Sequence, residues 1–130
     1  MAVVTRALAC FRVAIPWETV KVRLVATHAD LRRTWRSTCR ASMARGEVLR
    51  AFFVPYARGA VGEIVLRLDC LDVEHVTHES MHAVLHSVRR AGVSTLPLND
   101  DEQEERIVTV AGKLAHRITR ELARRGYACA

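Results

Sequence analysis

The chain has 130 residues, of which 50% are hydrophobic, so it is large enough to form one domain with a core of its own and is unlike a disordered polypeptide. No apolar run approaches the roughly 18 residues that a membrane-spanning helix requires, so we expect no transmembrane segment. The formal net charge is +6 and only 5% of residues are aromatic, which leaves phosphate contacts open but argues against a stacking surface for single-stranded nucleic acid.

The first ten residues carry no motif that we assign to a function. They resemble a lipoprotein signal only faintly, because Arg6 interrupts a short apolar region and no basic segment precedes it. We therefore expect no export and a cytoplasmic location.

The cysteines are widely spaced and form no CxxC pair, so we expect reduced thiols at Cys10, Cys39, Cys70 and Cys129.

The next segments predict a strand over 21–25, a helix over 29–45, and two strands over 47–56 and 62–70. Asp30 lies near the start of that helix and Gly46 is its expected stop. Trp35, Phe52 and Phe53 are interpreted as ordinary core residues. The arginines of the helix recur at helical spacing and could form a phosphate-facing strip, although a solvated helix face explains them as well: Arg32, Arg33, Arg36 and Arg40.

A second helix is predicted to open at Val73, with Asp72 as its N-cap and Gly92 as its stop. It contains the sequence His78-Glu79-Ser80-Met81-His82, an HExxH motif. Residues four apart lie on one face of a helix, so both imidazoles can reach one cation. Glu79 lies about a hundred degrees round the helix, where it can take a proton from a water that the metal activates.

The same predicted helix carries two further histidines. His75, His78, His82 and His86 project within an arc of about 60 degrees. Only His78 and His82 bracket the glutamate correctly, so the metal is assigned to that pair. His75 and His86 are interpreted as structural residues or as residues that support the ligands.

A third metal ligand is expected from a third helix, predicted over 101–125 after a loop over 94–100. Extending its apolar stripe backward places Glu104 at the edge of the buried side and Glu105 on the solvent side. Glu104 is therefore the predicted third ligand and Glu105 the fallback, although an acidic first turn also stabilises a helix N-terminus. Cys70 is a less favoured ligand. The stripe consists of Ile107, Val110, Ala111, Leu114, Ile118 and Leu122.

The HExxH motif and a glutamate on a following helix resemble the gluzincin metallopeptidases, in particular minimal forms of the kind found in phage and prophage genomes. The resemblance covers residues 62–120, and no metzincin-type extension follows His82. It implies Zn²⁺ on His78, His82 and Glu104, with Glu79 as general base and an extended peptide or protein paired with the sheet edge beside the active helix. Gluzincins also use a Tyr or His to stabilise the developing charge, for which only His116 or Tyr127 can be nominated.

The predicted fold is therefore α+β and zincin-like, a single domain over residues 1–130. In it, a small, mostly antiparallel sheet packs against the HExxH helix and a second ligand-bearing helix. The strand beside the active helix is expected to be the one around 48–54 or the one around 62–68. The predicted function is a zinc-dependent hydrolase of the metallopeptidase class. Two alternatives stay open: an inactive zincin-like binding, virion or regulatory protein with a structural metal, and a basic nucleic-acid-binding domain.

Overall fold

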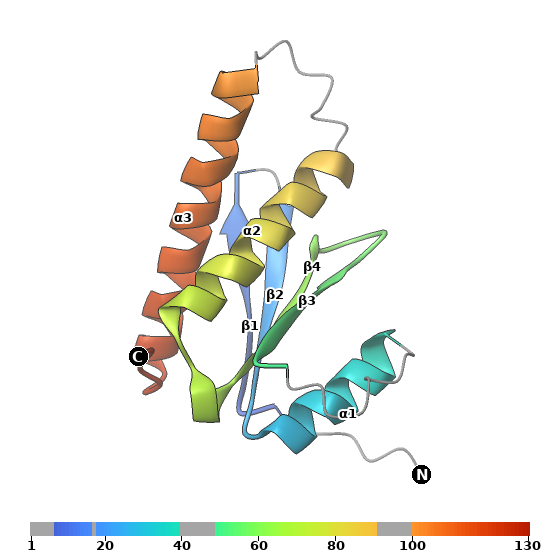
Figure 1. Cartoon of the computed structure of the whole chain (residues 1–130), viewed down its shortest axis with the longest axis vertical. Helices are drawn as coiled ribbons and strands as arrows, with labels where there is room; N and C mark the ends of the chain where they lie inside the picture. The colour runs from blue at the N-terminus through green and yellow to red at the C-terminus, as the bar shows by residue number, and fades with distance from the viewer. Residues whose placement is uncertain (1–6, 17, 40–48, 91–99) are drawn as a thin grey trace.

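The structure is a computed structural model that describes residues 7–16, 18–39, 49–90 and 100–130. Its four strands form one sheet in the order β1-β2-β4-β3 (Figure 1). The elements in chain order are β1 (Ala9–Ile15), β2 (Glu18–Val25), α1 (His28–Cys39), β3 (Ala51–Pro55), β4 (Gly62–Arg67), a short 3-10 helix η1 (Leu68–Cys70), α2 (Val73–Arg90) and α3 (Asp100–Arg124).

The sheet is mixed. β1 pairs antiparallel with β2, and β3 pairs antiparallel with β4, whereas the two central strands β2 and β4 run parallel. The α+β class with mostly antiparallel pairing is thus confirmed. Of the two strands named as candidates for the edge beside the HExxH helix, β3 lies at the edge and β4 is interior.

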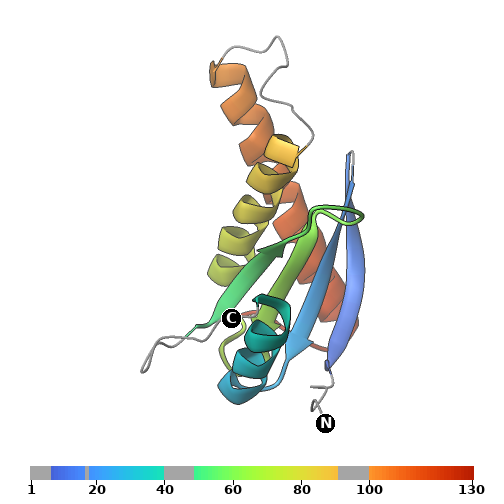
Figure 2. The same ribbon diagram turned by 90° about the vertical axis from the view of Figure 1, so that its right-hand side faces the viewer.

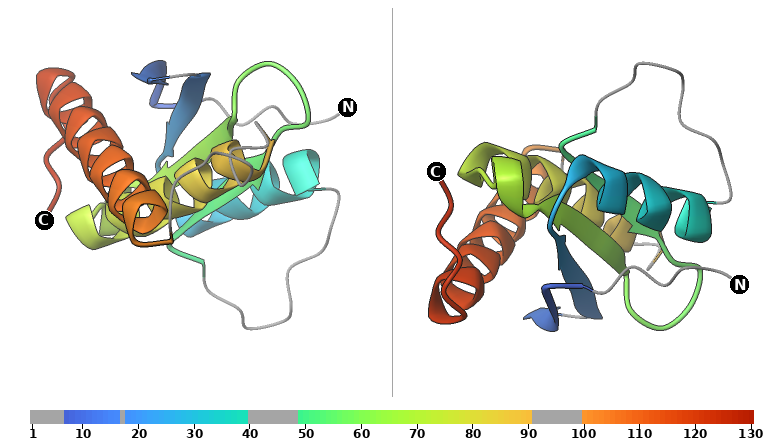
Figure 3. Two further views of the ribbon diagram at one scale, coloured as in Figure 1. Left: turned by 90° about the horizontal axis from the view of Figure 1, so that it is seen from above. Right: turned by 90° about the horizontal axis from the view of Figure 1, so that it is seen from below.

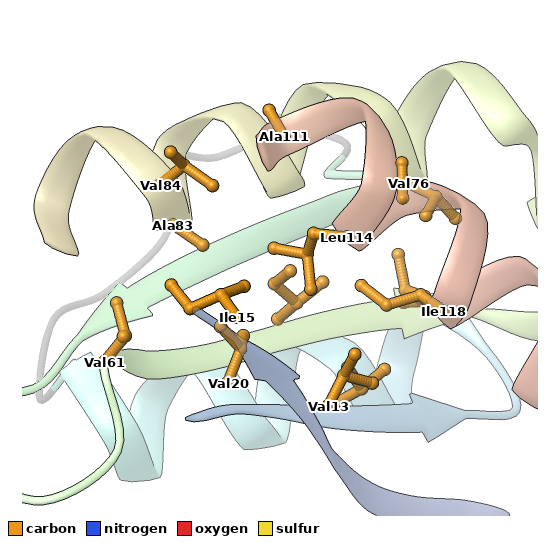
Figure 4. Close-up of a cluster of buried hydrophobic side chains, with 14 of the residues drawn as sticks. Val13, Ile15, Val20, Val61, Val76, Ala83, Val84, Ala111, Leu114 and Ile118 are labelled. Carbon is orange, nitrogen blue, oxygen red and sulfur yellow. The ribbon is translucent and has the colours of Figure 1, made fainter. Parts of the chain in front are cut away.

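The helices form layers on both faces of the sheet. Figure 2 shows α1 on one face and α2 with α3 on the other, and Figure 3 shows the same arrangement from above and below. The larger core lies between the sheet and the α2–α3 pair (Figure 4). The smaller core lies under α1, where Trp35 packs edge-on against Phe52 with ring centroids 5.0 Å apart.

The strand β1 is absent from the sequence-based prediction, which assigned no element before residue 21. Its buried residues alternate with exposed ones along the whole strand, as expected where one face of a strand packs on a core. The helix over 29–45 corresponds to α1, which begins at His28 after Thr27. The backbone N–H of Asp30 donates to Thr27 Oγ1 (3.3 Å), so Thr27 caps this helix. The expected stop at Gly46 lies outside the described residues.

The two C-terminal helices follow the prediction closely. The backbone N–H of Glu74 donates to Asp72 Oδ1 (2.7 Å), which confirms Asp72 as the N-cap of α2. The predicted stop at Gly92 and the loop over 94–100 lie almost entirely outside the described part of the chain. α3 buries the predicted stripe, with Ile107 only partly buried at its start. No helix in the described ranges is both long enough and apolar enough to cross a membrane.

Candidate metal centre

The HExxH motif lies in the middle of α2, on the side of the helix that faces the edge strand β3. The opposite side of α2 packs on the sheet and on α3 through Val76, Ser80, Ala83, Val84 and Val88. This packing fixes the rotation of α2 about its axis. The histidines are therefore directed toward β3 rather than toward α3, and they line two hollows together with residues of the β3 segment.

His78 and His82 are close enough to share one cation. Their Nε2 atoms are 3.1 Å apart, and their rings meet edge-on with centroids 4.8 Å apart. Two imidazole nitrogens bound to a tetrahedral zinc at its usual bond length would lie about 3.3 Å apart. Both side chains are exposed, so a cation can reach them from solvent. The pair therefore fits two of the ligand positions of a metal site.

Glu79 lies beside this pair and is nearly buried. Its exposed fraction is 7%, and no hydrogen bond links its carboxylate to another described residue. Burial raises the pKa of the Glu79 carboxyl above its ordinary value of 4.5, while the charges that His78, His82 and His75 can carry act in the opposite direction. A poorly hydrated carboxylate without a partner is a better proton acceptor than one in water.

Two hollows meet at Glu79. One, of about 430 Å³, extends toward Phe53, His86 and Arg89. The other, of about 370 Å³, extends toward Arg50, Glu74 and His75. Both are also lined by Ala51 of β3, so the two hollows follow the line between α2 and the sheet edge. Glu79 thus lies at the centre of an open groove.

The two remaining histidines of α2 are engaged with backbone carbonyl groups. His75 Nδ1 lies 3.2 Å from the carbonyl oxygen of Cys70, and His86 Nε2 lies 3.0 Å from that of Tyr56. A carbonyl oxygen only accepts, so in each case the ring nitrogen carries the proton. These contacts favour the structural interpretation of His75 and His86.

The structure does not bring Glu104 or Glu105 to the histidine pair. Both side chains are exposed near the start of α3, so the expectation that Glu104 lies on the buried side is wrong. The physical reason is that the first turns of α3 extend beyond the elements that bury its later turns (Figure 1). Over the described ranges, no group of three or more His, Cys, Asp or Glu side chains is placed to hold a metal ion.

The other nominated residues also lie elsewhere. His116 is exposed on α3, and the Tyr127 hydroxyl lies 3.5 Å from the carbonyl oxygen of Leu8. Cys70 contacts the carbonyl oxygen of Arg50 through its thiol, at 3.8 Å. Neither His116 nor Tyr127 lines the two hollows at Glu79.

Three residues that line the groove belong to no sequence motif and were not predicted as site residues. Arg50 and Phe53 come from the edge strand and the residue before it, and Arg89 comes from the last turn of α2. Arg89 lies seven residues after His82, two helical turns along the same face. That spacing is the signal that could have identified it.

No protein-family model, curated protein or solved structure matches this chain. The interpretation of the site therefore depends on its own geometry.

Proposed function

We propose that this protein is a zinc-dependent hydrolase that acts on peptides, with His78 and His82 as metal ligands and Glu79 as the general base. The observation that carries the proposal is the meeting of two imidazole Nε2 atoms at 3.1 Å beside a buried carboxylate that has no hydrogen-bond partner in the described structure. This is also the function that the resemblance to minimal gluzincins implies. Zinc, when bound, lowers the pKa of a coordinated water and polarises a substrate carbonyl.

The role of Glu79 follows from its surroundings. Glu79 is largely buried, yet it borders both hollows of the groove together with Ala51 of the edge strand. A water molecule at the histidine pair would lie within reach of this acceptor, and a proton held on Glu79 could then be given to the leaving amine. The raised pKa of Glu79 favours the uptake of that proton.

A peptide substrate is supported by the position of β3. β3 pairs only with β4 among the described strands, and no described strand occupies its outer edge beside the groove. An extended peptide can add to such an edge through main-chain hydrogen bonds, with alternate side chains directed into neighbouring hollows. Phe53 supplies an apolar wall and Arg89 a charge at one end of the groove.

One observation favours a second candidate, an inactive zincin-like binding, virion or regulatory protein, because a catalytic zinc site needs three protein ligands. Two imidazoles form an incomplete zinc site, and the part of the chain that the structure describes adds no third ligand. Glu104, with Glu105 as its fallback, remains a predicted ligand that only a measurement can test. In either case we propose a cytoplasmic location, consistent with free thiols at Cys10, Cys70 and Cys129.

The test combines zinc titration with peptide hydrolysis. Calorimetry should show one zinc site whose affinity falls more than about tenfold in His82→Ala, because one of two ligands is lost. His116→Ala, which removes an exposed imidazole from α3, should leave zinc affinity unchanged. Glu79→Gln should bind zinc within about threefold of wild type but hydrolyse a fluorogenic peptide mixture at least about 100-fold more slowly.

Other results would change the assignment. Zinc affinity that is equal in wild type and His82→Ala would remove the metal site. Zinc binding without hydrolysis in wild type would favour the non-catalytic candidate. Loss of zinc in Glu104→Ala or Glu105→Ala, taken separately, would restore the corresponding carboxylate as the third ligand.

A further inference from the structure

A second groove lies at the opposite edge of the sheet, between β1 and α3. It has a volume of about 450 Å³, and four arginines line it with a single carboxylate, that of Glu121. A smaller adjoining hollow shares Ala14 and Arg117 with it and adds Lys113. We call this the basic groove; its charged residues are Arg12, Lys113, Arg117, Arg120, Glu121 and Arg124.

Most of this positive charge is not neutralised within the protein. Arg12, Lys113 and Arg120 are exposed and form no ion pair with any residue that the structure describes. Glu121 is held by Arg124 (Nη2 to Oε1, 2.5 Å) and by Arg125 (Nε to Oε1, 2.9 Å), so its charge is already balanced. The basic groove therefore carries a local excess of cations on a protein whose net charge is +6.

The cations of α3 form one row. Lys113, Arg117, Arg120 and Arg124 are spaced by four, three and four residues, which places them on one face of the helix over about 16 Å. Arg117 Nη1 donates to the carbonyl oxygen of Ala14 (2.7 Å), which ties this face of α3 to the edge strand. One strand of a nucleic acid duplex carries about five phosphates over the same length.

We propose that the basic groove binds the phosphate backbone of double-stranded nucleic acid without reading its sequence. Arginine is suited to phosphate because its guanidinium can donate two hydrogen bonds to one phosphate group. No aromatic side chain lines the basic groove, so it offers no surface on which bases of a single strand could stack. The apolar face of α3 is buried against the sheet, so this helix cannot insert into a membrane.

The sequence suggested a different phosphate-facing strip, on α1. There Arg33 is bound to Asp30 (Nη2 to Oδ1, 2.6 Å), and Arg40 lies outside the described residues. Arg36 is exposed on α1 and Arg58 is exposed in the turn between β3 and β4. Arg36 and Arg58 provide a matched control, because substituting them removes the same amount of positive charge at positions outside the basic groove.

The experiment measures binding of a fluorescent 20-base-pair DNA duplex by anisotropy at several NaCl concentrations. Wild-type protein should bind with a slope of log K against log [NaCl] of about −3 to −4, as expected when about four phosphates are neutralised. The double variant Arg12→Gln/Arg120→Gln should weaken binding at 50 mM NaCl by about tenfold or more and make the slope shallower by about 2. Arg36→Gln/Arg58→Gln should change the slope by less than about 0.5.

Three outcomes would overturn the proposal. The first is no duplex binding at 50 mM NaCl, and the second is an equal loss in both double variants, which would indicate diffuse attraction by net charge. The third is tighter binding of a single strand, or of vesicles containing anionic lipid, than of the duplex. Thermal unfolding of each variant confirms that it is folded, and none of these readings depends on zinc or on hydrolysis.

Discussion

At the scale of single residues, the carboxylate of Glu79 has no hydrogen-bond partner among the described residues, although Glu79 is only 7% exposed. A buried carboxylate normally has a cation or several hydrogen-bond donors, because an ionised group without partners is costly to remove from water. Glu63 illustrates the usual case, since it is paired with Arg23 and accepts a hydrogen bond from the Tyr56 hydroxyl (2.6 Å). Glu79 has no such partner in the described structure, which agrees with the proposed role of accepting and releasing a proton.

The cost of burying Glu79 predicts that Glu79→Gln is more stable than wild type in metal-free buffer. The folded state raises the pKa of Glu79, so wild type loses stability as the pH rises from about 4.5 through the raised value, whereas the glutamine variant does not. The difference should be absent near pH 4 and should grow as the pH rises toward 8. There we expect the variant to melt a few degrees higher, since about 1 kcal/mol shifts Tm by roughly 3 to 6 °C in a domain of this size.

Melting curves in EDTA at pH 4, 5.5 and 7.5 test this prediction. A variant that is less stable than wild type at pH 7.5 would mean that the Glu79 carboxylate has a stabilising partner. The same curves show that loss of hydrolysis in Glu79→Gln does not come from misfolding.

At the scale of elements, the edge strand that borders the groove depends on one glycine. Gly62 opens β4 opposite Pro55 of β3. A Cβ atom at Gly62 would collide with the carbonyl oxygen of Val54 and the ring of Phe53. The close approach of the two backbones at this point therefore requires a residue without a side chain.

We predict that Gly62→Ala destabilises the protein by more than about 2 kcal/mol, because a backbone carbonyl cannot move aside as a flexible side chain can. The matched control is Gly112→Ala on the exposed face of α3, where nothing lies within 4 Å of an added Cβ. That change should stabilise the protein by about 0.5 to 1 kcal/mol, since alanine has the higher helix propensity. Urea unfolding of both variants measures the two effects. If both variants changed the free energy of unfolding by the same amount, the backbone would have moved to accommodate a Cβ atom at Gly62 without destabilising the protein.

The same elements show how much of the fold can be predicted from the sequence. Helical periodicity predicted α2 and α3 because each buries one stripe, and the Asp72 cap defined where α2 begins. β1 was harder to predict, because Arg12 is the only charged residue between its buried positions. In β2, by contrast, Lys21 and Arg23 alternate with buried apolar residues. The burial pattern of a strand is therefore visible in the sequence only where its outward-facing residues are polar.

The candidate site was predictable only in part. The spacing of HExxH determines that His78 and His82 meet, because both residues lie on one helix. The position of Glu104 depends on how far α3 extends beyond its neighbours, and periodicity gives only the angle about a helix axis. Arg50 and Phe53 reach the groove through the strand order, which local sequence does not specify.

At the scale of the whole molecule, the strand order separates the two candidate sites. The groove at Glu79 borders β3, and the basic groove borders β1. These two strands are the opposite edges of the sheet. Charge changes at one edge should therefore leave zinc binding at the other unaffected. The pairing of β2 with β4 joins the two halves of the sheet, and polar groups at the end of α2 add a link to β2 and to the β3–β4 turn.

Arg90, at the end of α2, is the main bridge of this kind. Its guanidinium donates to the carbonyl oxygens of Tyr56 (3.1 Å), Gly59 (2.8 Å) and Ala60 (2.9 Å), and it is paired with Glu18. Glu18 in turn accepts a hydrogen bond from Ser87 (2.7 Å). One side chain thus joins the last turn of α2, the start of β2 and the turn that follows β3.

We predict that Arg90→Met lowers the free energy of unfolding by about 2 to 4 kcal/mol, because three carbonyl groups and a partly buried carboxylate lose a charged donor. The control is Arg89→Met, which makes the same substitution at the exposed neighbouring residue. It should change the free energy of unfolding by less than about 0.5 kcal/mol. Adding Glu18→Gln to Arg90→Met should restore part of the lost free energy of unfolding, because the double variant no longer carries an unpaired carboxylate at position 18. Urea unfolding at pH 7 measures all four proteins. If Arg90→Met and Arg89→Met were equally stable, the contacts of Arg90 would contribute nothing to the fold, and another group would have to hold the β3–β4 turn against α2.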